Sequence, residues 1–102
     1  MARTREELQT ELEELLGSEN VYYQPPPSMF MKYPAIVYHR NDIRSTHADN
    51  LPYRRGHVYD VTVIDEDPDS VIVEKVSKLP RCRFDRHYTA DELNHDVFTL
   101  YY

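Results

Sequence analysis

Leucines near the start of the chain recur at the spacing of one helix face, with polar residues between them. This pattern predicts a helix over residues 3–16. Thr4 and Glu7 have the spacing of a capping box, and Gly17 supplies the left-handed residue that commonly ends a helix. The leucines that form the face are Leu8, Leu12, Leu15 and Leu16.

Four later segments combine β-branched and aromatic residues with alternation of apolar and polar positions, which predicts strands. In the second of them, Tyr59, Val61 and Val63 fall on one face and Val58 and Thr62 on the other. The four predicted strands are residues 33–40, 53–65, 81–88 and 95–102.

A second helix is predicted between the second and third strands. Asp67 is in position to cap it, Pro68 suits its first turn, and Pro80 ends it. Its core face would contain Ile72, Val73, Val76 and Leu79. The β-branched residues there also fit a strand, so the prediction rests on the capping signals and the helical spacing.

The third strand has Cys82, Phe84 and Tyr88 on one side and Arg83, Asp85 and His87 on the other if it alternates regularly. Residues 89–94 then predict a turn or a single helical turn before the last strand. A cysteine on the apolar side of a strand is a small hydrophobic residue more often than a nucleophile.

The element order α-β-β-α-β-β predicts an α+β fold, a four-stranded, mainly antiparallel sheet with two helices on one face. The 102 residues provide one hydrophobic core, so residues 1–102 are taken as a single domain. The sheet and second helix would occupy residues 33–102. Two helices on one face leave the other face, and the sheet edges, for solvent or a partner.

Residues 18–32 are predicted to form a stiff arm, because three consecutive prolines deny the backbone its ladder donors. Docking such an arm on another subunit costs little entropy. An arm that closes over the chain's own core fits the pattern equally well. The candidate contact residues of the arm are Tyr22, Tyr23, Met29, Phe30 and Met31.

A long polar segment between the first two strands is the second candidate contact region, since long loops often carry function. Its arginines could meet phosphate, but the interspersed carboxylates favour either solvated side chains or salt bridges in an interface. The candidate interface residues are Arg44, Asp49, Asn50, Tyr53, Arg54 and Arg55.

Composition narrows the function classes. The net charge of -6 repels phosphate, which argues against general nucleic-acid binding. Nine tyrosines and three phenylalanines suit half-buried positions and protein interfaces. The single Cys82 permits no intrachain disulfide, no signal peptide is evident, and no apolar run is long enough to span a membrane. These features predict a cytosolic protein.

The chemistry-bearing residues give little sign of catalysis. His87 and His95 could approach an ion together with Asp91 or Asp96, but their spacing matches no zinc motif. With two glycines the chain cannot build a phosphate-cradling loop. The sequence therefore predicts a protein that is not an enzyme, with no catalytic, cofactor or metal site.

Long stretches of the chain resemble small tail proteins of long-tailed bacteriophages, of the tail terminator or tail completion (head–tail joining) type. The resemblance is one of pattern and element order over nearly the whole chain, without a motif of known chemistry. The stretches that carry it are residues 33–53, 59–65 and, above all, 83–98.

This resemblance implies a virion structural protein that assembles in the cytoplasm of the host bacterium and occupies the head-proximal end of the tail. It implies a homo-oligomeric ring, a hexamer, that docks on the tail tube protein, ends tube growth and meets the head–tail connector proteins. DNA would pass through the ring without specific binding. The alternatives are a head-completion or connector subunit, a metal-dependent enzyme centred on His87 and His95, and a module that binds a peptide at a sheet edge.

Overall fold

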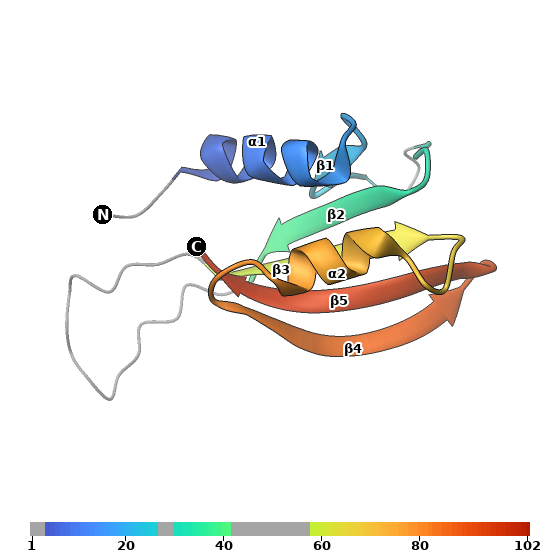
Figure 1. Cartoon of the computed structure of the whole chain (residues 1–102). Helices are drawn as coiled ribbons and strands as arrows, with labels where there is room; N and C mark the ends of the chain where they lie inside the picture. Colours follow the sequence, from blue (N-terminus) through green and yellow to red (C-terminus); the bar gives the residue numbers. More distant parts are fainter. Residues whose placement is uncertain (1–3, 27–29, 42–57) are drawn as a thin grey trace.

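The computed structural model describes residues 4–26, 30–41 and 58–102, which form two helices and five strands (Figure 1). In chain order the elements are α1 (Arg5–Leu16), β1 (Val21–Tyr23), β2 (Ala35–Arg40), β3 (Val58–Asp65), α2 (Val71–Ser77), β4 (Cys82–Ala90) and β5 (Leu93–Tyr101).

The sheet corrects the predicted fold. The fold is α+β with two helices, but the sheet is five-stranded and mixed, in the order β1-β2-β3-β5-β4. β1 pairs with β2 in parallel, and all the other neighbouring strands are antiparallel. The predicted four-stranded sheet and the order α-β-β-α-β-β are therefore wrong, because a strand precedes the first one that the sequence indicated.

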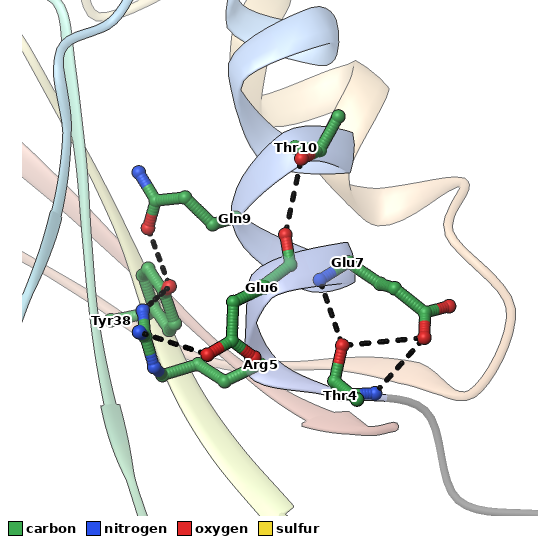
Figure 2. Close-up of polar contacts among 7 residues, drawn as sticks. All are labelled: Thr4, Arg5, Glu6, Glu7, Gln9, Thr10 and Tyr38. Carbon is green, nitrogen blue, oxygen red and sulfur yellow. Dashed lines mark hydrogen bonds and ion pairs between the residues drawn. The ribbon is translucent and has the colours of Figure 1, made fainter.

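Helix α1 forms where its local signals place it. The Thr4 hydroxyl accepts from the Glu7 backbone N–H at 3.2 Å, and the Glu7 carboxylate accepts from the Thr4 N–H, which completes the predicted capping box (Figure 2). Gly17, with φ of 80°, ends the helix. Leu8, Leu12 and Leu16 are buried, which confirms the predicted face.

Strand β1 lies in the segment that the sequence assigned to an irregular arm. Val21 is buried, and its carbonyl accepts from the Gln9 side-chain amide at 3.1 Å. The other end of the Gln9 amide accepts from the Tyr38 hydroxyl at 2.5 Å, so one residue of α1 joins β1 to β2 (Figure 2). Gln9 and β2 are distant in sequence from β1, so no local sequence pattern predicts this strand of three residues.

Helix α2 is shorter than predicted. Ser70 caps it by accepting from the Ile72 backbone N–H at 3.2 Å, whereas Asp67 and Pro68 lie in the preceding turn. The predicted cap at Asp67 is therefore wrong. Asp67 instead accepts from the Asp69 backbone N–H at 2.9 Å, a side-chain turn that competes with helix formation.

Strands β4 and β5 form a hairpin. The turn contains only Asp91 and Glu92, whose φ angles of 52° and 63° are those a type I′ turn requires, so of the two alternatives predicted for residues 89–94 the structure has the turn and not the helical turn. The register also shifts between Phe84 and Arg86, which leaves Asp85 as the extra residue of a β-bulge. After the bulge, Tyr88 is on the face opposite to Phe84, which corrects the predicted alternation.

One face of the sheet carries the core. Leucines of α1 and Ile72 and Val76 of α2 form a cluster with alternate residues of the strands, so both helices pack on the same face. The strand residues of this cluster are Val21, Ile36, Tyr38, Tyr59, Val61, Val63, Phe98 and Leu100. Within residues 4–26, 30–41 and 58–102, no helix is long and apolar enough to cross a membrane.

Candidate interaction surface

The sheet face opposite the helices is the first candidate surface. By register, the row Val37, Thr62 and Val97 crosses this face and ends at Arg86 on β4. Thr62 and Val97 are buried, so the accessible part of the face lies toward its rim. The rim on β4 consists of arginine and tyrosine, which are among the residues enriched at protein interfaces.

The exposed side chains of β4 opposite the helices are Arg83, Arg86 and Tyr88, which we call the β4 face. Tyr88 is 42% exposed and stacks on His95 of β5, with ring centroids 4.6 Å apart and planes 13° from parallel. The Arg86 guanidinium lies 6.0 Å from the Tyr88 ring centroid. The stacking holds the tyrosine in one orientation, which lowers the entropy that a contact would cost.

The bulge places a carboxylate beside one arginine of the β4 face. Neighbouring side chains of a regular strand point to opposite faces, but the extra residue allows Arg86 Nη1 to lie 2.6 Å from Asp85 Oδ2. Arg83, in contrast, has no ion pair in the part of the chain that the structure describes. It lines a shallow hollow with Thr99 and Tyr101.

Helix α1 carries the opposite charge at the other end of the sheet. Glu6, Glu7 and Glu14 are exposed and Glu13 is half-buried; we call these four the acidic α1 face. The helix has no basic residue in its last turn. Arg5 lies at its start, where its guanidinium donates to the Tyr38 hydroxyl at 3.3 Å and pairs with Glu6 at 3.7 Å (Figure 2). The guanidinium also lies over the Tyr23 ring, and these contacts hold the helix on the sheet.

The predicted arm residues have different surroundings. Phe30 is 98% exposed, and Met31 and Tyr22 are partly exposed. Tyr23 packs against the chain's own core, with its ring centroid 4.9 Å from that of Tyr38. Tyr23 therefore fits the alternative in which the arm covers the chain's own core, and Phe30 fits the alternative of a contact arm. The role of the arm in contacts stays a prediction.

The remaining predicted interface residues lie outside the described residues, so their role stays a prediction. They are Met29, Arg44, Asp49, Asn50, Tyr53, Arg54 and Arg55.

The two histidines considered for a metal site lie on opposite faces of the hairpin. His87 Nδ1 is 2.8 Å from Asp96 Oδ1 on the helix side, whereas His95 stacks on Tyr88 on the other side. They cannot bind one ion together. Across the described ranges no three histidine, cysteine, aspartate or glutamate side chains are placed to hold a metal.

Cys82 lies on the helix side of β4, half-buried, and burial raises the pKa of its thiol from 9.0 to about 11. At pH 8 we expect the thiol of the folded protein to react with iodoacetamide roughly 100-fold more slowly than that of the urea-unfolded chain, because only the thiolate reacts. The rate in the folded state should rise about tenfold per pH unit up to pH 10. A folded-state rate equal to that of the unfolded chain at pH 8 would contradict this placement.

The β4 face was not predicted from the sequence, although Arg83, Arg86 and Tyr88 all lie in the segment predicted as the third strand. Regular alternation, however, placed Tyr88 beside Phe84 and away from Arg83, and only the bulge brings the tyrosine to the side of the arginines.

Comparisons of the chain with protein-family models, with curated proteins and with solved structures found no match.

Proposed function

We propose that this protein is a structural subunit of a bacteriophage tail, of the tail terminator or tail completion type. In this role it forms a ring at the head-proximal end of the tail, ends growth of the tail tube and joins the tail to the head. The resemblance of residues 33–53, 59–65 and 83–98 to such proteins supports the proposal.

The observation that carries the proposal is the exposed rim of the sheet face opposite the helices. The centre of that face is buried, at Thr62 and Val97, whereas its rim presents Arg83, Arg86, Tyr88 and Tyr101 at exposed positions. Surfaces that combine exposed aromatic rings with arginines are typical of contacts between proteins. The helix side adds Phe84, which is 57% exposed on the outermost strand.

Charge supports the same role. A ring through which DNA passes must not hold the phosphates, and the net charge of -6 gives the subunit a repulsive field. This supports passage of DNA without specific binding.

Purified protein mixed with tail tubes is expected to form rings and to cap the tube ends in negative-stain electron micrographs. Light scattering of the protein alone should show a multiple of 12.2 kDa. A protein that stays monomeric and binds neither tail tubes nor head–tail connectors would overturn the proposal. If the protein binds head–tail connectors but not tail tubes, it belongs to the connector side of the head–tail joint.

The variant Phe30→Ser tests the arm within the same assay. Phe30 is almost fully exposed, so its loss should leave the melting temperature unchanged and weaken tube binding roughly tenfold, as the loss of an aromatic interface anchor does. Val71→Ser is the matched control, because Val71 is also an exposed apolar residue, at 63%, but belongs to α2. Equal weakening of tube binding by the two variants would show that the arm does not contact the tail tube.

A further inference from the structure

Opposite charges gather at opposite ends of the sheet. Helix α1 contacts β1 and β2, at one end of the strand order, and carries the acidic α1 face. Strand β4 is the last strand at the other end and carries Arg83 and Arg86, with the exposed Arg81 just before it. Figure 1 shows α1 and β1 on one side of the molecule and β4 on the other. Each copy therefore carries both halves of a complementary pair.

The β4 face is suited to side-chain contacts and poorly suited to strand addition. An outermost strand of nine residues would ordinarily offer a row of backbone groups to another strand. The bulge at Asp85 interrupts that row and twists the edge, which is a common protection against edge pairing. A partner is then recognised by the arginines and Tyr88. Arg86 is already paired with Asp85, so it is Arg83 that favours a negatively charged partner.

The dimensions of the two surfaces agree. The 12 residues of α1 span about 18 Å, and the 9 residues of β4 span about 30 Å, so the helix fits along the strand with both ends supported. Glu14 has no ion pair within the described part of the chain, and neither does Arg83, so both charges are available to a second copy.

We propose that copies of this chain associate head to tail, with the acidic α1 face of one copy lying along the β4 face of the next. The inference rests on the proposed ring and names the contact that builds it. Because the two surfaces differ, the contact is heterologous, and repeating it closes a ring when the rotation between neighbours permits. A two-fold dimer formed by either surface packing on itself would instead place like charges against each other.

Charge reversal tests the contact in the full-length protein. Arg83→Glu with Arg86→Glu, and separately Glu6→Lys with Glu14→Lys, should each weaken self-association at least tenfold in analytical ultracentrifugation. Raised salt should weaken association of the wild type, because it screens exposed charges. Lys75→Glu with Lys78→Glu is the matched control for the arginine variant, since it makes the same charge change on the exposed surface of α2 and just after it.

Mixing the two reversed variants gives the sharper result. In the mixture every reversed helix can meet a reversed strand and every native helix a native strand, so an alternating ring satisfies all contacts. Association of the mixture should return to within about threefold of wild type, although each variant alone remains dissociated. Circular dichroism of each variant checks that the fold is intact.

The outcomes separate this inference from the proposed function. A wild-type oligomer that neither reversal weakens beyond the α2 control would overturn the head-to-tail contact and leave the ring standing. Dissociated variants that fail to recover on mixing would also overturn it. A wild-type protein that remains monomeric at millimolar concentration and does not bind tail tubes would overturn both the head-to-tail contact and the proposed function.

Discussion

Replacing Phe98 by alanine is expected to lower the free energy of unfolding by about 3–5 kcal/mol, the range for removing a fully buried aromatic ring. Phe98 is 1% exposed and lies at the centre of β5, between β3 and β4 in the sheet. Its direct neighbours across the strands are Val61 and Phe84, and its loss leaves a cavity in the hydrophobic core. Domains of this size have total stabilities of about 5–15 kcal/mol, so the variant should be close to unfolding.

The matched control is Phe84→Ala. The Phe84 ring meets Phe98 edge to face, with centroids 5.6 Å apart, but it is 57% exposed. We expect a loss of about 1 kcal/mol, which is the worth of an aromatic pair with little buried area. Urea unfolding followed by far-UV circular dichroism measures both. Equal losses in the two variants would show that β4 is covered more fully than the structure indicates.

Helix α1 and strand β3 could be predicted because their signals are local. The Thr4–Glu7 capping box, Gly17 and the leucine spacing all lie within one segment and agree with one another. In β3, Tyr59, Val61 and Val63 lie on the core face, as their spacing predicted. A strand that packs one face against helices has its core residues at every second position.

The errors of the prediction have two causes. Val21–Tyr23 looks like part of a proline-rich loop, and it becomes a strand because β2 supplies the backbone partners and Gln9 a side-chain donor, both outside the segment. Asp67 is as good a cap as Ser70 by residue type, but its carboxylate is used in a turn with Asp69. There the competing hydrogen bonds are local, and residue type alone does not decide between them.

The candidate surface was predicted only in part, for a similar reason. The sequence indicated that one sheet face would lack helices and that aromatic residues would serve contacts. It could not reveal that a single extra residue at Asp85 brings Tyr88 to the side of Arg83. The complementarity of α1 and β4 also required the strand order, since the two elements are far apart in the chain and reach opposite ends of the sheet.

Tyr38 is expected to be the most sensitive polar position of the core. The Tyr38 side chain is fully buried. The centroid of its ring lies 4.9 Å from that of Tyr23 and 5.8 Å from that of Tyr59. Burial raises the pKa of the phenol, so the hydroxyl remains protonated at neutral pH and donates to Gln9. Tyr38→Ala should cost about 3–5 kcal/mol of unfolding free energy. Tyr38→Phe, which removes only the hydroxyl, should cost about 1–2 kcal/mol.

The network that joins α1, β1 and β2 makes a further, separable prediction. Gln9→Leu leaves the Tyr38 hydroxyl without its acceptor and the Val21 carbonyl without its side-chain donor, and should cost about 1–3 kcal/mol. Because Gln9 and Tyr38 share one hydrogen bond, the double variant with Tyr38→Phe should lose less than the sum of the two single losses. Amide exchange in β1 should quicken in Gln9→Leu more than in Tyr38→Phe, since only the former frees Val21. Additive losses with unchanged exchange in β1 would mean that Gln9 does not hold α1 on the sheet.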